Sequence, residues 1–250
     1  MKRLIAILSV LAALVLFSPQ GALAYTNFSF SVGFHDSLAP YGTWVNFSTY
    51  GPVWRPAVAG FVPFTSGHWV YTSYGPTWVG YEPYEWAVYH YGQWVPSPEF
   101  GWVWVPGYTW SPGNVVWATG PGYIGWAPNY PGFSPASFSA FVFVDSNHFN
   151  YPNYSNVLIR GERVRPLFER RVVQVQRAAL PRQDVERIIR RPVQVARVQE
   201  RTVEVDHHRT RMIVPEGHEN AFKEVSRAAA ITKSHEAERE KQKKATVKSE

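Results

Sequence analysis

The chain has 250 residues, contains no cysteine and carries a formal net charge of +6 at pH 7. Without cysteine, disulfides, thiolate metal sites and cysteine catalysis are excluded, so stability has to come from packing. The charge is divided unevenly: residues 25–150 hold one cation and five acids (net −4), whereas residues 151–250 hold 22 Lys and Arg and 14 Asp and Glu (net +8). This asymmetry suggests two bodies with different roles.

The first 24 residues have the three-part pattern of an export signal. Two cations open the segment, an apolar run covers residues 4–17, and Ala22 and Ala24 place small side chains where a signal peptidase reads. The alternative is a membrane anchor, but the run is short for a bilayer crossing, which needs about 20 apolar residues. We therefore predict a signal peptide over residues 1–24 and an exported protein, in the periplasm or, alternatively, the extracellular space.

A Gly-x-Trp-Val motif occurs three times at a period of 25 residues. Its copies begin at Gly42, Gly67 and Gly92 and contain Trp44, Trp69 and Trp94. A fixed period of this length indicates one supersecondary unit used several times. Each copy leads to a turn in which an aromatic residue precedes Gly, so one repeat is predicted to be about one β-hairpin. The Gly beside each Trp would leave room for an indole on the neighbouring strand.

Three further segments complete the predicted aromatic domain. Residues 28–34 alternate apolar and small side chains, which is the period of a strand. Residues 123–128 are typical of a closing strand and turn, and residues 138–144 form another apolar stretch. We place this aromatic-rich β-repeat domain at residues 25–150. Its fold class is mainly β, a compact antiparallel hairpin-repeat domain that is either a meander or barrel-like.

A basic Arg/Val-rich extension is predicted at residues 151–214. Its Val-rich stretches at 172–175 and 193–198 look extended, and residues 184–191 suit a short helix with apolar side chains at i, i+3 and i+4. Residues 215–250 form a charged tail with few large apolar groups. Such a tail should be a solvated helix or disordered, because it cannot bury enough surface to offset its ordering entropy.

The tryptophans allow two interpretations. The repeated Trp44, Trp69 and Trp94 are best interpreted as core positions, because each indole can bury about 150–250 Å². Trp102 and Trp104 share one face of a predicted strand, while the valines between and after them share the other face. Either the sheet is covered on both sides, or Trp102, Trp104 and Trp110 form an exposed platform that stacks on sugar rings or on a protein partner.

Catalytic and metal chemistry have weak support. Glu82 and Glu85 are the closest pair of carboxylates, and glycoside hydrolysis needs two carboxylates across the scissile bond. No third assisting group accompanies them, so we predict a non-enzymatic protein without catalytic residues, with a glycan hydrolase as an alternative. The histidines lack ligand spacing and no glycine-rich phosphate loop occurs, so neither a metal site nor a cofactor is predicted.

A cluster of arginines is the second candidate binding site. It consists of Arg160, Arg163, Arg165, Arg170 and Arg171. One interpretation is a solvated surface that alternates with valines facing a core. The other is a patch that binds anionic envelope polymers or lipid head groups at a membrane surface. Nucleic acid is not an expected partner of an exported chain.

Several aromatic segments together resemble a known family. They are residues 34–45, 53–56, 89–94 and 125–128. They are similar to exported bacterial Trp/Tyr/Gly-rich repeat proteins whose central region is a domain of unknown function, number 6600, and in style to the Tyr-x-Trp-x-Gly-x-Trp repeat proteins. The resemblance covers roughly residues 30–130. It implies export and an all-β repeat domain, and it brings no established activity and therefore no catalytic residue.

The sequence thus leads to an expected function. We expect a non-enzymatic envelope protein that binds glycan or protein partners through its aromatic surfaces and anionic envelope material through its basic segment. The alternative is a structural or assembly module without a small ligand, whose tail docks on a partner.

Overall fold

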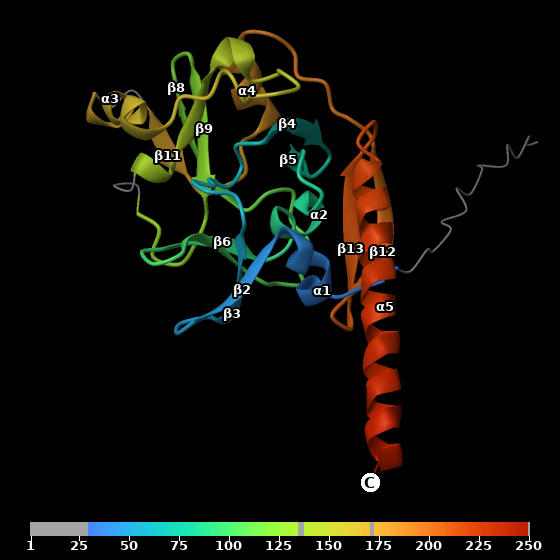
Figure 1. Cartoon of the computed structure of the whole chain (residues 1–250). Coiled ribbons are helices and arrows are strands. Elements are labelled where there is room, and N and C mark those ends of the chain that lie inside the picture. The colour runs from blue at the N-terminus through green and yellow to red at the C-terminus, as the bar shows by residue number, and fades with distance from the viewer. Residues whose placement is uncertain (1–29, 135–137, 171–172, 250) are drawn as a thin grey trace, which may run out of the picture.

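A computed structural model describes residues 30–134, 138–170 and 173–249. The predicted signal peptide, residues 1–24, lies outside the described residues, and so does Arg171. The protein is mainly β, with its strands divided among four sheets and a long C-terminal helix at one side (Figure 1). Of the two predicted arrangements, the meander is consistent with the structure, because sequential antiparallel hairpins form most of the strand pairs.

Four β-hairpins make up the aromatic part of the chain. They are β2 (Gly42–Phe47) with β3 (Gly51–Pro56), β4 (Gly67–Thr72) with β5 (Gly75–Gly80), β6 (Gln93–Ser97) with β7 (Gly101–Val105), and β8 (Val115–Gly120) with β9 (Tyr123–Pro128). In every one of them, two tryptophans lie directly opposite each other on the paired strands. The pairs are Trp44–Trp54, Trp69–Trp78, Trp94–Trp104 and Trp117–Trp126. Paired aromatic side chains are a main stabilising unit of antiparallel sheets.

The glycine of the motif has a steric role in the first two hairpins. A methyl group on Gly67 would lie 2.6 Å from the Trp78 ring and 2.3 Å from the Val79 carbonyl oxygen. A methyl group on Gly42 would lie 2.7 Å from the Trp54 ring. Both distances are too short for any side chain, so glycine is required there for the opposite indole to lie against the backbone. This confirms, for the first two copies, the prediction that glycine leaves room for an indole. At Gly92 of the third copy, a methyl group would instead lie 2.1 Å from the Val105 carbonyl oxygen.

The remaining strands extend this framework across the whole described chain. β2, β3, β7 and β6 form one sheet in that order, and β4 and β5 form a second. A third has the order β10-β9-β8-β11, with β10 at Val142–Asp145 and β11 at Gln174–Gln176. In the fourth, β1 (Phe30–Val32) lies parallel to β12 (Val198–Val205), which pairs with β13 (His208–Pro215).

The change of charge near residue 150 is not a boundary of the core. β11 comes from the basic extension and pairs with β8 of the aromatic part. Val185 and Ile189 belong to the same buried cluster as the tryptophans of the hairpins. The two oppositely charged halves therefore share a core, which corrects the expectation of two separate bodies. Charged side chains lie mostly on the surface, so their distribution along the chain does not show which apolar side chains pack together in the core.

Short helices connect the strands. They are α1 (Phe34–Leu38), α2 (Glu85–Val88), α3 (Arg165–Glu169) and α4 (Arg182–Ile189), with 3-10 turns at Ala39–Tyr41, Phe138–Ala140, Ser146–His148 and Gly161–Val164. α4 confirms the predicted short helix, and it ends where Arg190 adopts a left-handed conformation with φ of 55°. The stretch 193–198 is irregular up to Val198, where β12 begins.

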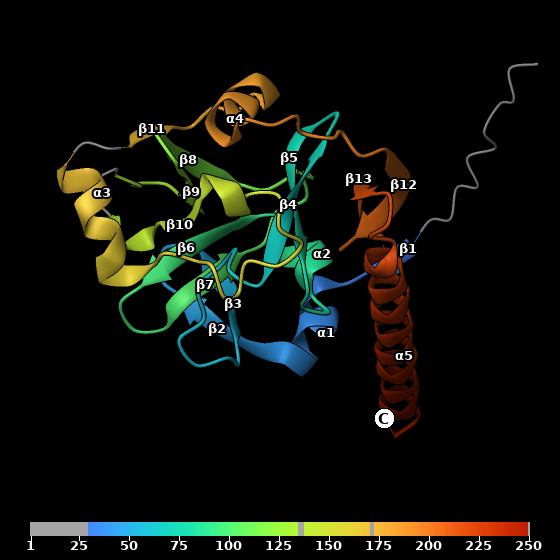
Figure 2. The same cartoon turned by 90° about the horizontal axis from the view of Figure 1, so that it is seen from above.

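The charged tail is one helix, α5 (Asn220–Ser249). Its first turns bury Phe222, Val225 and Ala228 against the body. Every residue from Glu236 to Val247 is exposed, and the helix extends beyond the rest of the molecule (Figure 1). Figure 2 shows α5 together with β12 and β13 at one side of the molecule, next to α1 and α2. Of the two predictions for the tail, the structure therefore confirms the solvated helix and not the disordered segment.

Asp36 ties α1 to α5. Its Oδ2 accepts a hydrogen bond from Nη2 of Arg239 at 2.9 Å, and its Oδ1 lies 3.2 Å from Nδ1 of His235. One turn earlier on α5, the Thr232 hydroxyl accepts a hydrogen bond from the Gly33 backbone N–H at 2.9 Å. Asp36 itself is 7% exposed, whereas His235 and Arg239 are about half exposed. These contacts fix the middle of α5 on the body.

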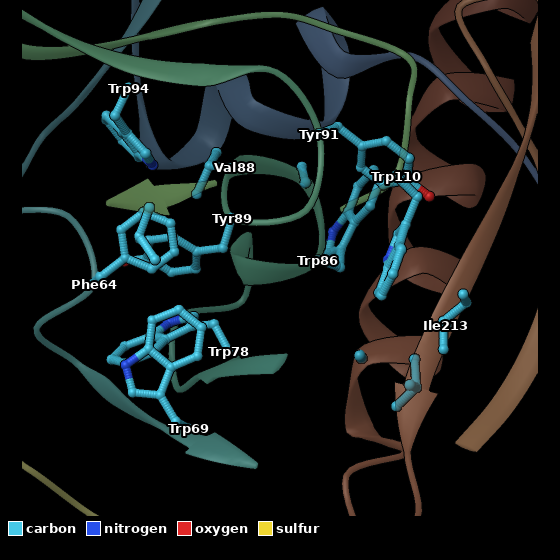
Figure 3. Close-up of a cluster of buried hydrophobic side chains, with 14 of the residues drawn as sticks. Phe64, Trp69, Trp78, Trp86, Val88, Tyr89, Tyr91, Trp94, Trp110 and Ile213 are labelled. Atoms are coloured by element: carbon cyan, nitrogen blue, oxygen red, sulfur yellow. The ribbon is translucent and has the colours of Figure 1, made fainter. Parts of the chain in front are cut away.

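Interlocking aromatic rings fill the centre of the core. Trp69 and Trp78 lie edge to face at 5.1 Å between ring centroids, and Phe64 contacts both (Figure 3). Several buried indoles also have a fixed polar end. Nε1 of Trp54, Trp104 and Trp126 donates to the carbonyl oxygens of Leu38, Tyr91 and Phe64 at 3.0, 2.7 and 2.9 Å. Nε1 of the buried Trp69, Trp78, Trp94 and Trp110 has no hydrogen-bond partner among the described residues, so packing of the rings is the main way in which the domain can be stable without cysteine.

Candidate functional site

The predicted platform of Trp102, Trp104 and Trp110 is not formed. Trp104 is fully buried, Trp110 is 6% exposed, and Trp102 is half-buried beside Tyr130. The reason is the position of β7 between β3 and β6, which places Trp104 inside the shared core. Trp102 and Trp104 do share a face, which is buried at Trp104 and half-buried at Trp102, and on the other face Val103 is buried and Val105 half-buried. The interpretation as core positions is therefore the correct one for Trp104 and Trp110.

Of the three repeated tryptophans, two are buried and one is not. Trp69 and Trp94 are 5% and 2% exposed. Trp44 is half-buried, stacks on His35 with 5.5 Å between ring centroids, and donates from Nε1 to the His35 carbonyl oxygen at 3.2 Å. The core assignment holds fully for the second and third copies and in part for the first. β2 and β6 are both edge strands of one sheet, so strand position alone does not explain why Trp44 is less buried than Trp94.

The predicted arginine cluster lies on the surface. Arg160, Arg163, Arg165 and Arg170 are all exposed, and we call these four side chains the basic surface. Val164 and Leu167 from the same segment are buried beneath them. Segregation of apolar and charged side chains to opposite sides of short helical turns places the cations in solvent.

Two of the four arginines are held by neighbouring groups. The Arg165 guanidinium pairs with Glu162 at 2.8 Å and lies 4.7 Å from the centroid of the Phe138 ring. Arg163 donates to the Leu158 carbonyl oxygen at 2.9 Å. Arg160 and Arg170 make no ion pair within the described residues. The basic surface therefore combines two anchored and two unpaired guanidinium groups.

A cleft of about 470 Å³ separates the β5–α2 connection from the first turns of α5. We call it the α2–α5 cleft. Glu82 and Glu85 line it from one side, and Lys223, Glu224 and Arg227 of α5 line it from the other. The sequence singled out the two glutamates as the closest carboxylate pair. It could not show that α5, more than a hundred residues later, supplies the opposite wall.

The carboxylates of the cleft are held by short-range contacts. Glu82 accepts hydrogen bonds from the Tyr89 hydroxyl at 3.1 Å and from the Tyr81 backbone N–H at 3.2 Å. Glu85 is 7% exposed, accepts from the Gly80 backbone N–H at 3.4 Å and lies 3.5 Å from Nε2 of His90. Burial raises the pKa of Glu82 to about 7, and the nearby charge of Glu85 adds to this, against the hydrogen bonds that lower it.

Two histidines lie next to the cleft. The rings of His68 and His218 are 5.2 Å apart, and burial lowers the pKa of His68 to about 4. His68 is also hydrogen-bonded to the Tyr81 hydroxyl at 3.1 Å. Across the described ranges, His, Asp and Glu side chains do not gather in any group of three or more that could hold a metal ion.

The fold defines a β-rich protein built from tryptophan-paired hairpins that pack against a long C-terminal helix. Residues 35–133 match the family model of DUF6600, a family of unknown function, which confirms the resemblance to domain number 6600. The match runs from α1 through all four hairpins. No curated protein and no solved structure matches the chain. None of the helices in the described part of the chain combines the length and apolar character that crossing a membrane requires.

Proposed function

We propose that this is an exported, non-enzymatic protein of the cell envelope that binds anionic envelope material through its basic surface. The observation that carries the proposal is the contrast between the two candidate surfaces. The arginines of the basic surface are exposed, whereas the indoles of the candidate platform are buried or half-buried. The export pattern of residues 1–24 supports the location, where anionic polymers and lipid head groups are the available polyanions.

Arginine suits this kind of ligand. Its planar guanidinium can donate two parallel hydrogen bonds to a phosphate or a carboxylate, and it stays charged at every physiological pH. The unpaired Arg160 and Arg170 are free to make such contacts. Arg163 and Arg165 are held in place, so they lose less side-chain entropy when a ligand binds.

The test compares binding of the protein and its variants to purified lipopolysaccharide, with neutral dextran as the uncharged comparison. Replacing Arg160, Arg163 and Arg170 together by glutamine should weaken binding to lipopolysaccharide about tenfold or more and reduce its dependence on salt. The matched control replaces Arg197, Arg209 and Lys241, three exposed cations elsewhere, by glutamine. Equal binding by the two triple variants would contradict the proposal.

The second candidate is an assembly module whose tail docks on a partner. The exposed end of α5, from Glu236 to Val247, favours it. A chain that ends at Arg239 distinguishes the candidates, because it keeps the buried Phe222 and Val225 and the contacts of Asp36. If the basic surface is the binding element, this shortened chain should bind lipopolysaccharide as the full chain does. Loss of binding in the shortened chain would favour the tail instead.

A further inference from the structure

The α2–α5 cleft carries charges of opposite sign on its two walls. Glu82 and Glu85 make no ion pair with lysine or arginine within the described residues, and Lys223 makes no ion pair there at all. Arg227 pairs with Glu224 on its own helix at 2.6 Å. Carboxylates and a cation that are not neutralised by each other therefore face the same cleft.

Of the two carboxylates, Glu85 is buried and Glu82 is half-buried, and both are held in place. Glu85 is 7% exposed at the first position of α2, and its contacts with Gly80 N and His90 Nε2 are both long, at 3.4 and 3.5 Å. Taking a carboxylate out of water is costly unless a cation or several donors compensate. A cationic group in the cleft would supply this compensation, and the raised pKa of Glu82 is a sign that the protein alone does not supply it in full.

The size and the apolar lining restrict the ligand further. About 470 Å³ is within the range of small-molecule sites, roughly 300–1,000 Å³. Val79, Pro83 and Ala221 contribute apolar surface to the lining. These side chains suit small aliphatic groups on the ligand rather than a large ring or a long chain.

We propose that the α2–α5 cleft binds a small zwitterion, a short peptide with small aliphatic side chains. Its ammonium group lies against Glu82 and Glu85, and its carboxylate lies against Lys223, because Arg227 is already paired with Glu224. A purely anionic ligand would meet Glu82 and Glu85, and a purely cationic ligand would meet Lys223. Only a ligand with both charges is attracted by both walls. The proposal is independent of the basic surface, which lies near α3, on the side of the molecule away from α5 (Figures 1 and 2).

The first part of the test varies the ligand. Calorimetry on the full chain compares the dipeptide Ala-Ala with N-acetyl-Ala-Ala, which lacks the ammonium group, and with Ala-Ala amide, which lacks the carboxylate. Ala-Ala should bind, and each blocked form should bind about tenfold more weakly or worse. The absence of binding by Ala-Ala at millimolar concentration would overturn the proposal, and so would binding of either blocked form as tight as that of Ala-Ala.

The second part varies the protein. Lys223→Gln should weaken binding of Ala-Ala about tenfold but change binding of Ala-Ala amide little, because that ligand has no carboxylate for Lys223 to contact. Glu85→Gln should likewise weaken binding of Ala-Ala but change binding of N-acetyl-Ala-Ala little, because that ligand has no ammonium group for Glu85 to contact. Lys233→Gln, an exposed lysine further along α5, is the matched control and should change neither. If Glu85→Gln does not fold, Lys223→Gln decides alone, and an equal effect on both ligands would contradict the assignment.

Failure of this proposal and failure of the proposed function can be distinguished. The triple glutamine variant of the basic surface should bind Ala-Ala like the unmodified protein. Lys223→Gln should in turn bind lipopolysaccharide like the unmodified protein. Loss of both kinds of binding in either variant would mean that the cleft and the basic surface are not separate sites.

Discussion

Replacing Trp94 by alanine should lower the free energy of unfolding by about 3–5 kcal/mol, the usual cost of removing a buried aromatic side chain. Trp94 is 2% exposed, pairs across the hairpin with Trp104 and contacts Trp54 and Phe61. Removing the indole leaves a cavity among rigid rings that cannot close around it. Denaturant unfolding followed by circular dichroism measures the change.

Trp44 provides the matched control, because it occupies the same position in the first hairpin. It is half-buried, so Trp44→Ala should cost only about 1–2 kcal/mol. A loss from Trp94→Ala no larger than that from Trp44→Ala would show that burial does not distinguish the two positions. The tryptophans would then need another explanation than packing.

Replacing Asp36 by asparagine should loosen α5 and lower the free energy of unfolding by about 1–2 kcal/mol. Asp36 is buried, but its partners His235 and Arg239 are about half exposed, so the loss lies below the range for a fully buried ion pair. Hydrogen exchange of the α5 amides should rise in the variant. Asp184→Asn is the control, because the pair of Asp184 with Arg187 lies on the surface and should contribute under 1 kcal/mol.

The contribution of Asp36 should also depend on pH. Burial by itself would raise the pKa of Asp36, but hydrogen bonds from His235, Arg239 and His35 outweigh it and hold the pKa below its usual value of 3.8. A lowered folded-state pKa stabilises the protein above the unfolded-state pKa, and this stabilisation is lost as the pH falls through the folded value. The difference between the protein and Asp36→Asn should therefore be full at neutral pH and should shrink below about pH 4. A constant difference from pH 7 to pH 3 would contradict this.

The hairpins could be predicted because their signal is local. Gly-x-Trp-Val at a fixed spacing and an aromatic-Gly turn define β2–β3, β4–β5 and β6–β7 without any long-range information. The hairpin β8–β9 was predicted only in its second strand, because Trp117 follows Val115-Val116 and lacks the motif. The pairing of β1 with β12 could not be predicted, since it joins Phe30 to Val203 and periodicity contains no information on partners so distant.

The residues of the candidate sites could be predicted from the sequence, but the solvent exposure of the tryptophan side chains could not. Period two correctly placed Trp102 and Trp104 on one face, but only the sheet order determines that this face is covered. The arginines were predicted to be exposed on one interpretation, and their exposure follows from the local alternation with Val164 and Leu167. The α2–α5 cleft required the docking of α5, which depends on Phe222 and Val225 reaching the core.

The central claim is that the tryptophans form the core and do not form an exposed binding platform. Quenching of tryptophan fluorescence by acrylamide tests this most directly, because nine of the 11 indoles are buried and only Trp44 and Trp102 are half-buried. We predict that a minor fraction of the emission is quenched in the folded protein and that neutral glycans leave this fraction unchanged. Quenching of most of the emission, or its protection by a neutral glycan, would contradict the claim.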